Sequence, residues 1–152
     1  MKKLFSITLM LILAVSLFML PSCAKKKGCM DANSVNFVSD AEEDDGSCKY
    51  QGKVIFWYGK DFADSCVAYG VNTIVIKVDG VIAGSSAASV YWVTAPSCSA
   101  SGTISYTKDL GSNKTGNVSA TLELGTGIGK ETITIPVTLN SANSCLLQEF
   151  QW

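Results

Sequence analysis

The residues best suited to chemistry in this chain are oxygen-bearing side chains gathered in a short stretch between two cysteines. Ca²⁺ prefers carboxylate and amide oxygens and takes about six to eight of them. Five candidate ligands lie between Cys29 and Cys48: Asp31, Asn33, Asp40, Asp44 and Asp45. The EF-hand loop does not fit, because placing Gly46 at its invariant glycine puts Ala41 where the first Asp is required. The stretch is therefore either a calcium loop or a solvated acidic spacer.

The absence of histidine and arginine excludes several kinds of catalysis and binding. The chain contains no histidine, and all twelve of its basic residues are lysine. Ser-His-Asp and Cys-His hydrolysis and HExxH zinc chemistry are therefore excluded within this chain. Residues 23–152 carry ten lysines and thirteen acidic residues, a net charge of −3. Because phosphate contacts need clustered positive charge, we expect no binding to nucleic acid.

The N-terminus has the pattern of an export signal. Lys2 and Lys3 precede a seventeen-residue uncharged and mostly apolar run, Leu4–Leu20, which is followed by Pro21-Ser22-Cys23. A basic start, an apolar centre and a small residue before the cut are typical of a signal peptide. The alternative is a retained transmembrane helix, since about 17–25 apolar residues span a bilayer.

Leu20-Pro21-Ser22-Cys23 resembles the lipobox of bacterial lipoproteins. The resemblance implies that residues 1–22 are removed and that Cys23 carries the lipid that anchors the protein to a membrane. Residues 23–27 then form a basic tether, in which each lysine near anionic head groups contributes about 1 kcal/mol. Ala24 is not the Asp that retains enterobacterial lipoproteins in the inner membrane. Because Lys25-Lys26-Lys27 departs from the acidic pattern of surface-displayed lipoproteins, we expect an outer-membrane protein that faces the periplasm.

Five cysteines lie beyond the lipobox, and export places them in an oxidising compartment. Cys29 and Cys48 close the acidic segment 28–48, which is too short to bury a core alone, so we predict a disulfide worth about 3 kcal/mol. The other three cysteines are Cys66, Cys98 and Cys145. We favour a Cys98–Cys145 pair, which would tie a loop to the start of the last strand. Cys66 is then free or paired with another chain.

The acidic segment also resembles a known module. Residues 28–48 read GCMDANSVNFVSDAEEDDGSC. This is similar to the pattern GCTDPxAxNYxxxAxxDDGSC, found in secreted and surface proteins of marine Bacteroidota. Met30, Ala32 and Ser34 depart from it. The resemblance implies no enzymatic role for this module.

Residues 52–152 have the pattern of an all-β domain. Apolar residues alternate with polar ones over residues 73–78, 118–124 and 132–139, as in strands buried on one face. Further strands are expected over residues 53–58, 89–94, 102–107 and 145–152. Asp79-Gly80 indicates a tight hairpin, and Pro136 indicates an edge strand or a bulge. About seven short strands predict a single small β-sandwich.

Four short stretches of this region are similar to small β-sandwich lipoprotein domains of the same bacteria. They are Gly52–Trp57, Ile76–Gly80, Ala95–Cys98 and Ser144–Leu146. The strand–turn–strand unit at Asp79-Gly80 also resembles PEGA-type domains. These resemblances imply a fold and assign no activity.

Aromatic residues suggest one competing function. Sugar-binding modules stack carbohydrate rings on exposed aromatics, and candidates here are Trp57, Tyr58, Tyr91, Trp92 and Trp152. However, both faces of residues 54–58 are apolar, which indicates a central strand with buried aromatics. If residues 89–94 form a strand, Tyr91 and Trp92 point to opposite faces.

Taken together, the sequence predicts a non-catalytic, membrane-anchored binding or structural module of the cell envelope. Its partner is an envelope protein or a glycan, and the alternative is a carbohydrate-binding or adhesion protein. An enzyme would need a pocket with two facing carboxylates. Asp61 and Asp64 are close in sequence, but we expect them in a loop after the first strand of the domain.

Overall fold

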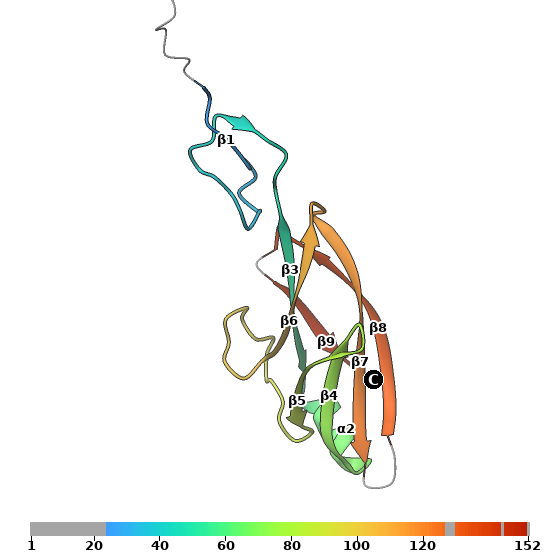
Figure 1. The fold of residues 1–152 in the computed structure, drawn as a ribbon. Helices are drawn as coiled ribbons and strands as arrows, with labels where there is room; N and C mark the ends of the chain where they lie inside the picture. The colour runs from blue at the N-terminus through green and yellow to red at the C-terminus, as the bar shows by residue number, and fades with distance from the viewer. Residues whose placement is uncertain (1–23, 127–129, 144, 152) are drawn as a thin grey trace, which may run out of the picture.

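The computed structural model describes residues 24–126, 130–143 and 145–151, and within them the chain is mostly β-strand (Figure 1). The elements are β1 (Lys27–Gly28), β2 (Glu43–Asp44), β3 (Tyr50–Tyr58), α2 (Lys60–Ala68), β4 (Val71–Val78), β5 (Val81–Ala87), β6 (Ile104–Gly111), β7 (Thr115–Thr126), β8 (Lys130–Asn140) and β9 (Leu146–Phe150). In these ranges no helix is both long and apolar enough to cross a membrane.

Two sheets form the body of the molecule. One has four antiparallel strands in the order β5-β4-β7-β8, and the other has three strands in the order β6-β3-β9. Strand β3 pairs antiparallel with β6 and parallel with β9. The all-β class is confirmed, and neither sheet closes on itself.

The core lies between the two sheets and follows from the alternation in the sequence. Inward-facing residues of β3 are Val54, Phe56 and Tyr58, and all three are buried. The four-stranded sheet contributes Ile74, Ile76, Val78, Val118, Ala120, Leu122, Leu124, Val137 and Leu139. Phe56 stacks on Phe150 of β9, with ring centroids 5.7 Å apart.

Two local predictions hold. Asp79 and Gly80 join β4 to β5 with φ angles of 49° and 83°, the positive values that a tight hairpin with both central residues left-handed requires. Pro136 lies in β8, an edge strand of its sheet, where its missing N–H removes no ladder bond to a further strand.

Two predictions about elements are wrong. Residues 89–94 form no strand: the chain turns after Ala88, and Val93 is 88% exposed. Asp61 and Asp64 do not lie in a loop but on α2, which starts directly after Gly59. Three buried residues, Phe62, Ala63 and Cys66, hold this helix on the end of the sandwich. Such a short apolar stripe gives little helical periodicity to detect.

Candidate functional site

The acidic segment is built around a disulfide. Cys29 and Cys48 are bonded, with their Cα atoms 4.8 Å apart, and Cys29 is fully buried. Strands β1 and β2 pair in parallel beside this bond. The disulfide therefore organises the segment, as predicted for a stretch with almost no core of its own.

The five predicted Ca²⁺ ligands each have other partners or lie apart. Asp44 and Asp45 accept hydrogen bonds from the backbone N–H groups of Gly46 and Ser47, and Asp40 pairs with Lys26. Asn33 donates its backbone N–H to the Asp31 carboxylate at 2.9 Å. Within the described ranges, no three acidic or cysteine side chains are grouped as a metal site requires. The structure thus does not bring the predicted ligands together.

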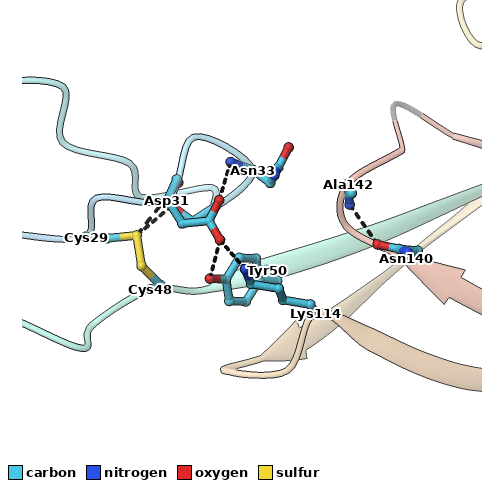
Figure 2. A network of polar contacts seen from close by, with 9 residues as sticks. Cys29, Asp31, Asn33, Cys48, Tyr50, Lys114, Asn140 and Ala142 are labelled. Atoms are coloured by element: carbon cyan, nitrogen blue, oxygen red, sulfur yellow. Dashed lines mark hydrogen bonds and ion pairs between the residues drawn. A yellow bond between two sulfur atoms is a disulfide. The ribbon is translucent and has the colours of Figure 1, made fainter. Parts of the chain in front are cut away.

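Asp31 instead joins the acidic segment to the sandwich. Its Oδ2 accepts hydrogen bonds from the Tyr50 hydroxyl at 2.8 Å and from Lys114 Nζ at 2.7 Å (Figure 2). Lys114 Nζ also lies 5.7 Å from the centroid of the Tyr50 ring. Tyr50 begins β3 and Lys114 lies in the turn between β6 and β7, so this contact bridges residues far apart in sequence.

The electrostatics of this junction follow from those contacts. The hydrogen bond from Lys114, followed by those from the Asn33 amide and the Tyr50 hydroxyl, lowers the pKa of Asp31 well below its usual range. The same ion pair raises the pKa of Lys114. Burial, and then the neighbouring Asp31, raise the pKa of Tyr50. The junction is therefore charged on both sides at neutral pH and has a structural role.

The feature best suited to bind a ligand lies elsewhere. A cavity of about 680 Å³ opens where β3 and β9 end, between α2 and residues 91–93. Its walls are Trp57, Gly59, Lys60, Asp61, Phe62, Ser65, Tyr91, Trp92, Val93, Glu149, Phe150 and Gln151. Cavities of about 300–1,000 Å³ with apolar walls and a few polar groups are typical of small-molecule sites.

Strand register and a loop together form these walls. Trp57 of β3 lies opposite Glu149 of β9, so both side chains are on the outer face of the three-stranded sheet. The loop after β5 runs over that end of the sheet, and the Trp92 N–H donates to the Tyr58 carbonyl at 3.1 Å. Tyr91 and Trp92 both line the cavity, and the strand on which their predicted alternation depended is absent.

A second disulfide secures this loop. Cys98 and Cys145 are bonded, as predicted, which ties the loop to the start of β9. Lys53 of β3 donates through Nζ to the Cys98 carbonyl at 2.9 Å. The two segments that carry Trp92 and Glu149 are thus fixed to each other through a covalent bond.

The charges in the cavity are mainly negative. Lys60 pairs with Asp64 one turn along α2, and that ion pair raises the pKa of the lysine. Lys60 Nζ also lies 5.9 Å from the centroid of the Tyr91 ring. Asp61 and Glu149 have no side-chain partner among the described residues. The cavity therefore offers two carboxylates as hydrogen-bond acceptors, beside a lysine that also pairs with Asp64.

Of the remaining predicted residues, Cys66 does not line this cavity. Cys66 is free and buried on the inner side of α2, and burial raises the pKa of its thiol. Such a thiol stays protonated and is a poor nucleophile. Cys23 and Trp152 lie outside the described residues.

Comparison with known proteins adds no assignment, because no protein family, no curated protein and no solved structure matches this chain.

Proposed function

We propose that this chain is a non-catalytic lipoprotein of the outer membrane, anchored through Cys23, that displays a ligand-binding cavity on a small β-sandwich. One observation carries the proposal. Figure 1 shows the described chain beginning at the acidic segment at one end of the molecule and α2 toward the other end, and residues of α2 line the cavity. A lipid on Cys23 would thus hold the protein by the end that is far from the cavity.

Binding without catalysis is favoured by the chemistry of the cavity. A glycosidase needs one carboxyl group that is kept protonated by burial and a second that is ionised. Asp61 lies exposed on the first turn of α2, and Glu149 is only partly buried. Neither carboxylate therefore has the burial that such a general acid requires.

The anchor is tested by metabolic labelling with a palmitate analogue in a bacterial host with lipoprotein-processing enzymes. The unmodified chain and a Cys66→Ser control are expected to take up the label, because Cys66 is buried inside the fold. Cys23→Ala is expected to lose it. A labelled Cys23→Ala protein would reject the lipoprotein function.

The cavity also favours a second candidate function, carbohydrate binding or adhesion. A flat row of exposed aromatics is not what the structure contains, since Phe56 and Tyr58 are buried. Three partly exposed aromatics line the cavity, Trp57, Tyr91 and Trp92, whereas Phe37 and Tyr69 are exposed elsewhere. Carbohydrate binding would therefore use a pocket rather than a platform.

A further inference from the structure

We infer that the cavity between α2 and residues 91–93 binds the terminal ring of a neutral glycan. This inference rests on the proposed binding function and names the class of its ligand. The cavity has three partly exposed aromatic side chains on its walls and two carboxylates without partners among the described residues.

The aromatic rings suit one face of a sugar. A pyranose carries its C–H groups on its two faces, and the face of an aromatic ring is negative and attracts such weakly positive hydrogens. Trp57, Tyr91 and Trp92 reach the cavity from two separate segments, one on β3 and one on the loop. Both segments therefore place aromatic residues on the wall of one cavity.

The carboxylates suit the edge of the same sugar. Hydroxyl groups donate hydrogen bonds, and ionised carboxylates accept them with charge-assisted strength. Glu149 lies opposite Trp57 in the β3–β9 register, so an acceptor stands beside a stacking surface. Asp61 supplies a second acceptor from α2. Two acceptors beside the aromatic side chains are enough to orient a ring that carries several hydroxyls.

The charge of the cavity selects against acidic sugars. The charged groups on the cavity walls are two carboxylates, Asp61 and Glu149, and one lysine, Lys60, which also pairs with Asp64. A uronate or a sulfated sugar would add a further negative charge to walls on which carboxylates outnumber lysine. A neutral ring meets no such repulsion.

The shape of the cavity is compatible with the end of a chain. The hollow is neither a flat surface nor an enclosed void, and α2 borders it on one side. A flat aromatic platform would admit the middle of a long polysaccharide. A recess that α2 borders on one side has room for a terminal ring while the rest of the glycan extends into solvent.

The test is calorimetric titration of the lipidated full chain in detergent micelles. The neutral probes are disaccharides of glucose, galactose and mannose. Digalacturonate is the acidic counterpart of the galactose disaccharide, and choline is a cationic probe. At least one neutral disaccharide is expected to bind, and digalacturonate is expected to bind about tenfold or more weakly than the galactose disaccharide. Binding of choline alone, or of digalacturonate as well as the neutral sugars, would overturn the inference.

Variants locate the binding. Glu149→Gln is expected to weaken the neutral sugar and to reduce the discrimination against digalacturonate, whereas Glu42→Gln in the acidic segment leaves both unchanged. Tyr91→Ala is expected to weaken every sugar about tenfold, whereas Tyr69→Ala, an exposed tyrosine away from the cavity, has no effect. Sugar binding that neither Glu149→Gln nor Tyr91→Ala alters would place the ligand elsewhere and reject the inference.

Failure of this inference is distinguishable from failure of the anchor. A chain that is labelled at Cys23 but binds no disaccharide retains the lipoprotein function and loses the ligand class. A chain that binds sugar without a lipid retains the ligand class and loses the anchor. Hydrolysis of the bound disaccharide would contradict the absence of catalysis and would support the ligand class.

Discussion

Asp31 has a different role from the one its acidic neighbourhood predicts. In sequence it is one of several carboxylates that could surround a cation. In the structure, the Lys114 ammonium group already lies at the place where a cation would neutralise it, and Tyr50 donates to the same oxygen. The charge of Asp31 thus connects two parts of the chain, and spacing along the sequence could not reveal a partner 83 residues away.

A pair of lysine variants tests this role through pKa values. Lys114→Met is expected to raise the pKa of Asp31 toward its ordinary value without moving that of Asp40, because Lys26 lowers the pKa of Asp40. Lys26→Met is expected to do the reverse. NMR titration of the aspartate side-chain carboxyls measures both values, and an Asp31 pKa unmoved in Lys114→Met would remove Lys114 as the cause.

The same shift predicts how stability depends on pH. The pKa of Asp31 is lower in the folded than in the unfolded chain, so its contribution to stability is fully present above the unfolded value near 3.8. It is lost as the pH falls through the folded value. Lys114→Met is therefore expected to be less stable than the unmodified chain at pH 6, with the difference shrinking in strong acid. Thermal unfolding followed at several pH values checks this.

At the scale of elements, the Cys98–Cys145 disulfide holds the loop that carries Tyr91 and Trp92, two residues of the cavity wall. It closes a span of 47 residues, so the chain-entropy model gives it about 4 kcal/mol of stability. Cys98→Ser with Cys145→Ser is expected to lose about that much free energy of unfolding in urea, and to bind sugar more weakly because the loop with Tyr91 and Trp92 is released.

Unchanged sugar binding in the double serine variant, with stability reduced, would show that the loop keeps its position without the disulfide. The position would then depend on its other contacts, such as the Trp92 N–H bond to Tyr58 and the Lys53 bond to Cys98.

A strand or helix could be predicted from the sequence when its own residues show a regular alternation of apolar and polar side chains. Strands β4, β7 and β8 were predictable because one face of each packs on the core and side chains alternate between faces. The strand predicted over residues 89–94 was wrong, because four consecutive apolar residues resemble a buried strand. In the structure these residues are exposed or partly exposed in a loop. The cavity could not be predicted from the sequence, because its walls come from three segments that are far apart in the chain. These segments meet only after the strands have formed both sheets.

At the scale of the whole molecule, the acidic segment lies at one end, and α2, which borders the cavity, lies toward the other end (Figure 1). The acidic segment continues directly into β3, which runs from Tyr50 at the junction to Tyr58 at the cavity. Strand β3 is central in its sheet and buried on its inner face, so it connects the two ends as a rigid element. A lipid at Cys23 would therefore leave the cavity pointing away from the membrane.

Fluorescence quenching in liposomes tests that orientation. With a fluorophore on Val93→Cys at the cavity, quenchers attached to lipid head groups are expected to have little effect. The same fluorophore on Glu42→Cys in the acidic segment is expected to be strongly quenched. Both positions are exposed, so the labels disturb little packing, and the buried Cys66 thiol is protected from labelling.

Adding Lys114→Met to the Val93→Cys protein makes the test specific to the junction. Without the ion pair between Lys114 and Asp31, the sandwich is expected to change its orientation relative to the acidic segment more freely. Quenching at residue 93 is then expected to rise, because the cavity lies close to the membrane for a larger fraction of the time. Equal quenching at residues 42 and 93 in the chain with Lys114 intact would mean that the sandwich lies flat on the bilayer. The cavity would then face lipid, and a free glycan end in the periplasm could not be its ligand.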